Sequence, residues 1–494
     1  MYLTVLVVIL LVFILILISV KSTNDAWMRS ISQKFPPGPR PLPLIGNLHI
    51  LNLKRPQKTF VELSKKYGSV FTVHMGMQKM VVLAGYETVK DALVHHANEF
   101  GERAFVPIFE DINKGFGLPF SHGETWKVMR RFTLSSMRDF GMGKRTIEDK
   151  IIEENEYLIK HFHSQEGKPF DVAVITNAAV ANIITSIVLG HRFDYNHPAL
   201  LKLTKLVTEN LRMVGSPMVT LYNLYPFVKF LPGTHKIILQ NIKEIHSFLR
   251  KTFLKSRKEL NSDDQRSFID AFLVKEEEEK TNPNSHFHEV NLISVVTTLF
   301  TAGTDTTSAT LQWSCLLMMK YPEIQRKVQE EIERVVGSQQ PTSGHRKLMP
   351  YTDAVLHEVQ RFGNIVPLSL PRETTVDVTF KGYFLPKGTF IIPLLESVLY
   401  DKTQFEKPEE FNPQHFLDSE GRFVKKDALM NFGAGRRVCI GETLARMELF
   451  VFFATLLQKF TLRLPPGVTQ VDLTPAIGLI TPPKPFKICA FSRF

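Results

Sequence analysis

The sequence predicts a mainly helical protein with a small β-rich region and a single N-terminal transmembrane helix. An uncharged apolar run covers residues 2–20, and a run of that length can cross a bilayer. Amphipathic stretches broken by glycines, prolines and polar clusters follow one another from 86 to 360, which is typical of helices. The stretches 70–85 and 376–395 combine short apolar strands with turn glycines, which indicates β-structure. We therefore expect one folded domain over 48–494 behind a membrane anchor.

The N-terminal run from Tyr2 to Val20 carries no charge. At about 1.5 Å per residue it just spans a bilayer core roughly 30 Å thick. A cleaved signal peptide would need a basic leader and a shorter apolar core, and the chain has neither. The first positive charges, Lys21, Arg29 and Lys34, follow the run. This order predicts an uncleaved anchor with the rest of the chain in the cytosol.

Residues 21–47 predict a basic, proline-rich hinge between the anchor and the folded domain. Its second half, FPPGPRPLPLIGN over 35–47, alternates prolines with glycines and apolar residues, so we expect a stiff, extended connector. Farther along, the acidic stretch KEEEEKTNPNS over 275–285 predicts a solvated loop.

Composition and charge limit the possible compartments and partners. The chain of 494 residues has three cysteines, too few for a disulfide framework, which favours a reducing compartment. Lys and Arg number 60 against 49 Asp and Glu, and a basic surface suits an acidic protein or an anionic membrane. The sequence contains no zinc-finger or RNA-binding signature, so we expect no nucleic-acid partner.

The stretch FGAGRRVCIG over 432–441 places Cys439 directly before a helical run over 442–460. Free amides and the dipole at a helix start stabilise a thiolate, which is then a nucleophile or a metal ligand. A nucleophile needs a nearby histidine as base, and none lies within twenty residues on either side. A dinucleotide-binding loop would need a third glycine at the usual place and a preceding strand, and this stretch lacks both. A buried structural cysteine would leave the glycines, Arg436 and Arg437 unexplained.

A lone acidic residue marks the long apolar run over 290–319. Asp305 is the only charged residue of this run, which also contains seven threonines. A second membrane span is possible by length, but the central charge beside Gly303 favours a long core helix. Because a buried carboxylate is costly without a role or a partner, Asp305 is a candidate functional residue.

The cysteine stretch matches the haem-binding signature of the cytochrome P450 family at Phe432, Gly435, Arg437, Cys439 and Gly441. The chain therefore resembles that family, whose iron is held by a cysteine thiolate. The resemblance implies a haem b cofactor with Cys439 as its axial ligand. It also implies that Arg437 pairs with a haem propionate and that Phe432 packs beside the thiolate.

The segment AGTDTT over 302–307 resembles the acid–alcohol motif of the same family. The resemblance implies that Thr306 hydrogen-bonds oxygen at the haem and that Asp305 helps to deliver protons. Splitting an O–O bond in a nearly dry pocket requires such a proton supply. We expect Ala302 and Gly303 to leave space at the helix surface for oxygen and water.

Further positions match the propionate-binding residues of the family. Trp126 and Arg130 are spaced i, i+4 on a predicted helix, and both side chains are donors, as carboxylate recognition requires. Arg103 and Arg372 match two more such positions. The resemblance assigns these four residues to the haem propionates, whereas a solvated helix surface is the alternative for Trp126 and Arg130.

Glu358 and Arg361 match the family's ExxR pair, whose spacing places both side chains on one helix face. The family completes this pair with an arginine, but the matching stretch here is Pro-Gln-His-Phe over 413–416. His415 can hydrogen-bond Glu358 when neutral, as a weaker and pH-dependent partner. We interpret this triad as structural support for the haem loop.

The expected substrate pocket is apolar and aromatic, which suits a lipophilic ligand. Resemblance assigns to it Phe105, Val106, Phe109, Phe116, Leu299, Val366, Leu370 and Leu479. For any one of these residues, an ordinary place in the core is the alternative.

The whole chain is most similar to the microsomal family-2 cytochromes P450 of vertebrates. The resemblance implies the mainly helical triangular-prism fold, an endoplasmic reticulum location and monooxygenation of xenobiotics, fatty acids or steroids. It implies electrons from NADPH–cytochrome P450 reductase and, in some members, from cytochrome b5. A basic face for that partner is expected at Arg436, Lys127, Arg131, Lys425 and Lys426.

Two other functions would keep the same cysteine. A thiolate-haem isomerase or dehydratase works without a reductase, and a haem-binding sensor or carrier has no turnover. The intact Asp305–Thr306 pair argues against the first, because such an enzyme delivers no protons to O2. Product formation that depends on NADPH and a reductase separates both from a monooxygenase.

Overall fold

The computed structural model describes residues 34–142 and 145–493. The predicted anchor over 2–20 and the first part of the hinge lie outside these residues. Within the described ranges, no helix is both long enough and apolar enough to cross a membrane.

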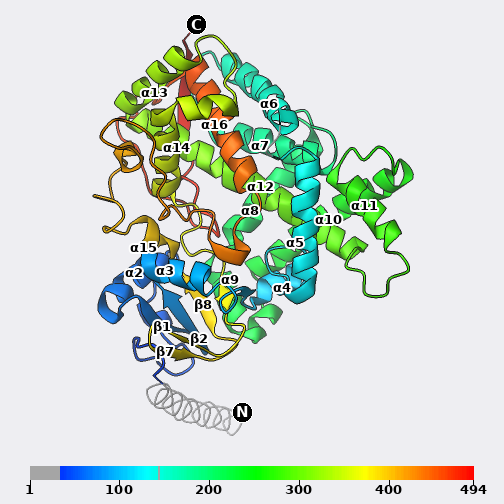
Figure 1. The fold of residues 1–494 in the computed structure, drawn as a ribbon, viewed down its shortest axis with the longest axis vertical. Coiled ribbons are helices and arrows are strands. Elements are labelled where there is room, and N and C mark those ends of the chain that lie inside the picture. Colours follow the sequence, from blue (N-terminus) through cyan, green and yellow to red (C-terminus); the bar gives the residue numbers. More distant parts are fainter. Residues whose placement is uncertain (1–33, 143–144, 494) are drawn as a thin grey trace, which may run out of the picture.

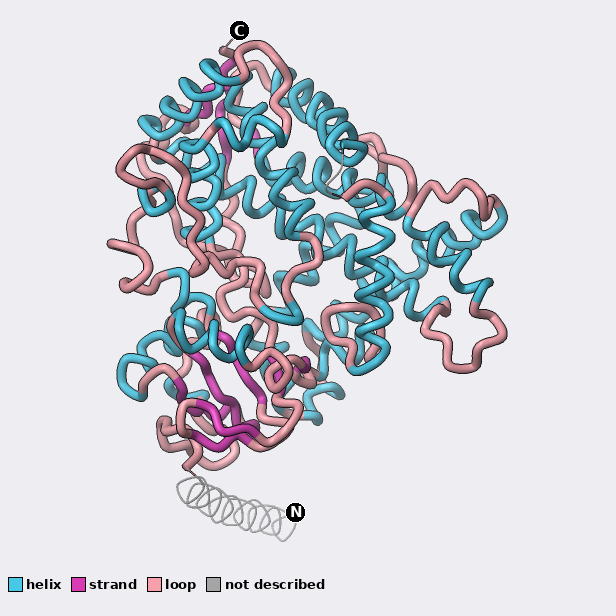
Figure 2. Tube along the Cα trace, in the orientation of Figure 1, coloured by secondary structure: helices cyan, strands magenta, loops and turns pink. Residues whose placement is uncertain are grey.

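Helices form most of the described chain, as the sequence predicts, and the strands gather in two places. Figure 1 shows the helices α5, α6, α7, α12, α14 and α16 above a sheet that lies close to the first described residues. Figure 2 shows a second, smaller group of strands at the opposite end, near the C-terminus. The predicted arrangement, mainly helical with a small β-rich region, is confirmed.

The main sheet has the strand order β1-β2-β8-β5-β3. Strands β1 and β2 form the predicted antiparallel hairpin, with Thr72 opposite Val81. Strand β5 pairs with β3 so that Arg372 lies opposite Arg103. This register brings together two arginines that are far apart in the sequence. The strands of this sheet are β1 Val70–Met75, β2 Gln78–Leu83, β3 Glu102–Arg103, β5 Arg372–Glu373 and β8 Phe390–Pro393.

Two smaller sheets complete the β-structure. One has the order β4-β10-β9, and the other is the two-stranded pair of β6 and β7. Their bounds are β4 Phe170–Asp171, β9 Phe460–Arg463, β10 Lys487–Ser492, β6 Val378–Phe380 and β7 Tyr383–Leu385.

Most of the helices fall in the predicted stretch over 86–360 or in the predicted run over 442–460, whereas α2 and α15 lie outside both. The α-helices are α2 Pro56–Tyr67, α3 Tyr86–Lys90, α4 Pro107–Asn113, α5 Gly123–Asp139, α6 Arg145–Ser164, α7 Val172–Val188, α8 Pro198–Val214, α9 Pro217–Leu224, α10 Thr234–Lys258, α11 Phe268–Glu278, α12 Glu289–Lys320, α13 Pro322–Val335, α14 Pro350–Gly363, α15 Leu395–Leu399 and α16 Glu442–Lys459. Shorter turns are η1 Leu48–Ile50, η2 Asp91–His95, η3 Pro226–Phe230, η4 Ser343–Leu348, η5 Pro413–Phe416 and η6 Gly435–Arg437.

Helix α12 is the long core helix that the sequence predicts. It is continuous over 32 residues, which corresponds to roughly 48 Å. His288 caps its start by accepting a hydrogen bond from the backbone N–H of Asn291. Most of its apolar residues are buried against neighbours that include α7, α14 and α16. Pro322 begins the next helix directly after it, because proline cannot continue α12.

The acidic stretch over 275–285 is only partly a loop, so that prediction was wrong in its first residues. Helix α11 continues to Glu278. Lys275 forms ion pairs with Glu278 at 2.9 Å and with Glu279 at 3.6 Å. Pairs spaced three and four residues apart stabilise a helix turn, so this charged segment extends α11 instead of ending it.

Candidate functional site

A cavity of about 310 Å³ lies between α12 and the cysteine loop, which we define as residues 431–441. Helix α5, strand β5, the loop after α14 and the first turns of α16 form the remaining walls. The sequence-predicted residues that line it are Arg103, Trp126, Arg130, Leu299, Ala302, Thr306, Val366, Leu370, Arg372, Phe432, Arg437 and Cys439. The fold therefore brings the cysteine, the arginines and the threonine of three separate motifs to one space.

The cysteine loop has a backbone that only glycine permits at Gly435. Its φ is +69°, and an added Cβ would lie 1.7 Å from the carbonyl oxygen of Leu93. Since neither the conformation nor the space suits a larger residue, this glycine fixes the path of the loop. The backbone N–H of Cys439 then donates to the carbonyl of Phe432 at 3.0 Å. Together these contacts place the Cys439 side chain on the cavity wall.

The Cys439 thiol is accessible from the cavity while protein surrounds the loop. Burial raises the pKa of this thiol, and hydrogen bonds from the backbone N–H groups of Gly441 and Glu442 act in the opposite direction. The start of α16 at Glu442 therefore supplies amides that favour the thiolate, as the sequence predicts, against the cost of burial. A coordinated cation deprotonates a thiol outright, so this position suits a metal ligand.

Buried positive charge gathers at one end of the cavity, at Arg103, Arg130, Arg372 and Arg437. Burial, followed by the neighbouring guanidinium of Arg437, lowers the pKa of Arg372 to about 9. Burial likewise lowers the pKa of Arg437 to about 10, although the Glu102 carboxylate opposes this. Glu102 accepts a hydrogen bond from Arg437 Nη2 at 2.6 Å. This single carboxylate leaves the cluster with an excess of positive charge.

The same cluster has hydrogen-bond donors that no protein group satisfies. Arg372 Nε and Arg437 Nη1 are buried and have no partner among the described residues. Arg103 donates instead to the carbonyls of Pro119 and Leu370 at 3.0 and 2.9 Å. Because buried polar groups are normally paired, the free guanidinium N–H groups indicate an anionic ligand in the cavity.

Trp126 and Arg130 lie on α5 beside this cluster. The Arg437 guanidinium stacks over the Trp126 ring at 3.8 Å from its centroid. Arg130 Nη2 donates to the carbonyl of Val438 at 2.9 Å, next to Cys439. The pair therefore connects α5 to the cysteine loop and does not form a solvated helix surface.

Helix α12 presents Ala302 and Thr306 to the cavity. The Thr306 hydroxyl donates to the Ala302 carbonyl at 2.7 Å. Gly303 also lines the cavity, and an added Cβ there would meet the Ile184 side chain at 2.5 Å. Its missing side chain thus also lets α7 approach α12.

Asp305 is separated from the cavity although it precedes Thr306 in the sequence. It is 4% exposed, and its Oδ1 accepts a hydrogen bond from Thr208 Oγ1 on α8 at 3.0 Å. Burial raises the pKa of Asp305 to about 7, and the Thr208 hydrogen bond acts in the opposite direction. The carboxyl therefore changes protonation near neutral pH from a position between two helices.

Glu448 is a cavity residue that the sequence analysis missed. It projects from α16, is 1% exposed and has an unpartnered Oε1. Burial raises its pKa to about 8, against a hydrogen bond with Thr307. One feature of the sequence could have identified it: Glu448 is the only charged residue in the apolar run over 447–458.

Three of the eight residues predicted for the substrate pocket line this cavity. Leu299, Val366 and Leu370 line the cavity, together with the unpredicted Leu118, Ile184, Thr298, Ile365 and Leu395. The predicted residues outside the lining are Phe105, Val106, Phe109, Phe116 and Leu479.

These five residues have other surroundings in the structure. Phe105 is exposed, Phe109 stacks on Phe120 with 4.0 Å between ring centroids, and Phe116 packs edge-on against His288. Val106 lies on the core at the start of α4, and the backbone N–H of Leu479 donates to the carbonyl of Leu211. Their contact with substrate stays a prediction.

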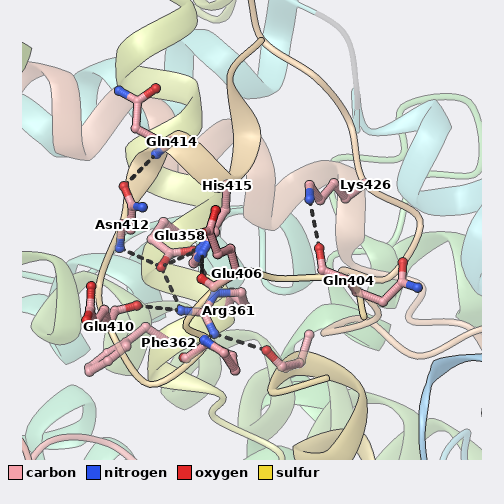
Figure 3. A network of polar contacts seen from close by, with 12 residues as sticks. Glu358, Arg361, Phe362, Gln404, Glu406, Glu410, Asn412, Gln414, His415 and Lys426 are labelled. Carbon is pink, nitrogen blue, oxygen red and sulfur yellow. Dashed lines mark hydrogen bonds and ion pairs between the residues drawn. The ribbon is translucent and has the colours of Figure 1, made fainter. Parts of the chain in front are cut away.

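The triad of Glu358, Arg361 and His415 lies outside the cavity wall (Figure 3). Arg361 Nε and Nη2 each donate to the Glu358 carboxylate at 2.7 Å. Arg361 also donates to the carbonyls of Leu399, Pro408 and Glu410 at 2.7 to 3.0 Å. The pair on α14 thus ties down the segment 399–412 that leads to the cysteine loop.

His415 contacts acceptors with both of its ring nitrogens. Nδ1 lies 3.2 Å from each oxygen of Glu358, and Nε2 contacts the carbonyl of Glu406. His415 therefore connects Glu358 on α14 to the backbone of the segment before η5, as the third member of the triad.

Comparisons with known proteins agree with this site. Residues 36–490 match the family model described as Cytochrome P450. The chain is 51% identical to cytochrome P450 2K1 of Oncorhynchus mykiss over 93% of this chain and 92% of that protein. It is 45% identical to cytochrome P450 2F2 of Mus musculus over 93% and 94% of the two chains. It is 46% identical to cytochrome P450 2C23 of Rattus norvegicus over the same shares.

The cofactor of this family, haem b with a cysteine thiolate ligand, fits the residues of the cavity. The described residues contain no group of three or more His, Cys, Asp or Glu side chains that could hold a metal ion, so an iron at Cys439 needs other ligands from a bound group. The free N–H groups of Arg372 and Arg437 suit propionate carboxylates. On the matched family model, these identities and this cavity, the chain belongs to the cytochrome P450 family and is a haem monooxygenase.

Proposed function

We propose that the enzyme inserts one oxygen atom of O2 into lipophilic substrates, which are xenobiotics, fatty acids or steroids, and reduces the other atom to water. Its electrons come from NADPH through NADPH–cytochrome P450 reductase, with cytochrome b5 as a second donor. One observation carries this proposal: a single cavity holds the Cys439 thiol, unpartnered guanidinium donors and the Thr306 hydroxyl.

Different residues around the cavity bind different parts of the cofactor. Haem, when bound, supplies the redox chemistry and the activation of O2. Cys439 would bind its iron through the thiolate, and Phe432 and Gly435 shape the loop that holds this side chain. The free donors of Arg372 and Arg437 would bind the propionates, with further positive charge from Arg103 and Arg130 and packing from Trp126 and Ala302.

In this proposal, Thr306 and Asp305 deliver protons. The Thr306 hydroxyl donates to Ala302 and can turn its O–H into the cavity by rotation about χ1. Asp305, with a pKa of about 7, is populated in both forms at neutral pH and can bind or release a proton. Such matching of pKa to working pH is what general acid–base catalysis requires.

The lining supports a lipophilic substrate. Leu299 and Ile365 face the cavity with Val366, Leu370 and Leu395. Their side chains offer apolar contact and no hydrogen bond, which favours apolar ligands over charged ones.

A basic surface supports an acidic redox partner. Arg131, Arg436 and Lys425 are exposed, whereas Lys127 is paired with Glu124 at 3.0 Å. Lys426 is turned inward, donates to the Gln404 carbonyl at 2.8 Å and has a pKa lowered by burial. We therefore assign the electrostatic contact to Arg131, Arg436 and Lys425.

Exposed apolar residues support a location at the endoplasmic reticulum membrane, with the folded domain in the cytosol. Phe227 and Phe230 of η3 are 63% and 75% exposed. The neighbouring Tyr225 donates its hydroxyl to the carbonyl of Leu44 at 3.0 Å, and Leu44 is itself exposed. This patch lies beside the segment that follows the predicted anchor, so both can meet one bilayer.

The proposal is tested with the full-length holoenzyme, the reductase, NADPH and three probe substrates: 7-ethoxycoumarin, lauric acid and a steroid. We expect at least one product with one oxygen atom from ¹⁸O-labelled O2, formed only when the reductase is present. A haem-loaded enzyme that forms no NADPH-dependent product from any probe would contradict the proposal. Product formation without reductase would indicate an isomerase or dehydratase.

A further inference from the structure

One hydroxyl group connects the buried Asp305 carboxyl to the protein surface. Thr208 Oγ1 donates to Asp305 Oδ1 at 3.0 Å. Thr208 belongs to α8 and is exposed, whereas Asp305 on α12 is buried. The two helices thus leave the buried carboxyl one direct hydrogen bond away from a side chain that contacts solvent.

A second contact orients the Thr208 hydroxyl. Asn177 Nδ2 on α7 donates to Thr208 Oγ1 at 3.4 Å, and Gln312 Nε2 on α12 donates to Asn177 Oδ1 at 3.3 Å. A hydroxyl has one donor and two acceptor positions. Because Asn177 uses one acceptor position, the O–H is free to point at Asp305 and the other lone pair is free for water.

Charged groups are few around this contact. Burial and Thr208 are the two causes that shift the pKa of Asp305, and α7 has no charged residue. On α8, the flanking Lys205 and Glu209 pair with each other at 3.9 Å. On α16, Glu448 contacts Thr307. The neighbour that directly contacts the Asp305 carboxyl is therefore a neutral hydroxyl, which can pass on a proton.

We propose that Thr208 is a positioning residue that holds Asp305 toward α8 and relays protons to it from solvent. This inference rests on the proposed role of Asp305 in proton delivery. In the relay, a hydronium ion gives a proton to Thr208 Oγ1 while Oγ1 passes its own proton to Asp305 Oδ1. Water and the hydroxyl are restored, the carboxylate becomes a carboxylic acid, and no electron is transferred.

The test compares Thr208→Val with Thr208→Ser, because serine keeps the hydroxyl and valine keeps the shape. Thr204→Val is the matched control on the same helix, since the Thr204 hydroxyl donates to the Leu200 carbonyl at 2.9 Å. In reconstituted holoenzyme turning over 7-ethoxycoumarin, we expect Thr208→Val to release severalfold more hydrogen peroxide per NADPH and to show a larger solvent isotope effect. Thr208→Ser and Thr204→Val should behave like the wild type.

A second readout does not depend on turnover. The infrared carboxyl band that disappears in Asp305→Asn is titrated in the resting holoenzyme. Removing the hydrogen bond to the ionised form should raise the pH of half-ionisation by about one unit in Thr208→Val, a tenfold change in proton affinity. A structural role of Thr208 would leave this value unchanged.

The outcomes separate this inference from the proposed function. If Asp305→Asn uncouples but Thr208→Val matches the wild type in peroxide release and titration, the relay is wrong and the role of Asp305 stands. If Asp305→Asn leaves coupling unchanged, the proposed role of Asp305 fails first. If Thr208→Ser is impaired as much as Thr208→Val, the hydroxyl does not relay protons.

Discussion

Single residues in the cavity have contacts that a fold description alone would not reveal. Asp305 and Thr306 are adjacent, yet one is bonded to α8 and the other lines the cavity. Glu448 enters the same cavity from α16 with an unpartnered oxygen. The carboxyl of Glu448 and the hydroxyl of Thr306 therefore line the cavity, whereas the carboxyl of Asp305 lies behind its wall.

Replacing Thr306 with alanine should uncouple NADPH oxidation from product formation. The variant lacks the hydroxyl that we assign to proton delivery, so electrons should appear as hydrogen peroxide in a proportion severalfold above the wild type. Peroxide and product are measured per NADPH. Ser314→Ala is the control, since that hydroxyl donates to the Thr310 carbonyl of the same helix at 2.9 Å and lies outside the cavity. Unchanged coupling in Thr306→Ala would remove the assigned role.

Replacing Glu448 with glutamine should stabilise the protein relative to the wild type, and the difference should grow as pH rises. Burial raises the pKa of this carboxyl from 4.5 to about 8. Between these values the folded protein keeps a proton that the unfolded chain releases, so the free energy of unfolding falls with rising pH. The slope for one such group is about 1.4 kcal/mol per pH unit, and it ends above the folded pKa.

The measurement is the thermal unfolding midpoint of both proteins from pH 5 to 8. We expect the difference between Glu448→Gln and the wild type to grow in favour of the variant across this window. Glu442→Gln, at the more exposed start of α16, is the control. A difference that stays constant with pH would mean that Glu448 titrates normally.

At the scale of elements, α14 and the segment 399–416 support the part of the chain that leads to the cysteine loop. Glu358 and Arg361 are fully buried, and Arg361 also donates to the backbone carbonyls of Leu399, Pro408 and Glu410 in the segment before η5 (Figure 3). Removing one member of a buried ion pair leaves an uncompensated charge and costs about 3–5 kcal/mol. We interpret the triad as structural support for this segment. Its third member, His415, is the residue that departs from the family pattern.

His415→Arg should keep the haem content, whereas His415→Leu should lose much of it. Arginine is always charged and offers several donors, so it can hydrogen-bond the Glu358 carboxylate as the imidazole does. Leucine serves neither Glu358 nor the Glu406 carbonyl. Haem per protein and the unfolding midpoint are measured, with Gln414→Leu as an exposed neighbouring control on η5. Equal haem loss in the arginine and leucine variants would mean that the hydrogen bonds of residue 415 do not support the haem loop.

For the whole molecule, membrane contact is expected at two places. One is the predicted anchor over 2–20, and the other is the exposed apolar patch at Phe227 and Phe230. A chain lacking 2–20 should still bind phosphatidylcholine–phosphatidylserine vesicles. Replacing both phenylalanines with serine should weaken that binding by at least tenfold, because each buried phenylalanine contributes about 1.5–3 kcal/mol.

Vesicle sedimentation provides the measurement. Leu254→Ser is the matched control, since Leu254 is exposed toward the far end of α10. If the double variant and the control bind equally, the patch does not face the bilayer.

The sequence predicts the fold class, the hairpin over 70–85 and the core helix, because apolar periodicity records these features, and the family resemblance predicts the cavity positions of the arginines. It does not predict that α8 supplies the partner of Asp305, since Thr208 carries no motif and the contact depends on helix packing. For the same reason the sequence does not predict which aromatic residues line the cavity: Phe109 is apolar whether it faces Phe120 or the cavity.

Thiolate ligation by Cys439 is the claim on which every assigned role depends. The direct measurement is the difference spectrum of the dithionite-reduced holoenzyme with carbon monoxide, recorded beside Cys439→Ser. We predict a strongly red-shifted Soret band in the wild type that is lost in the variant. A wild-type band at the position typical of histidine-ligated haem, or a red-shifted band that persists in Cys439→Ser, would contradict the account.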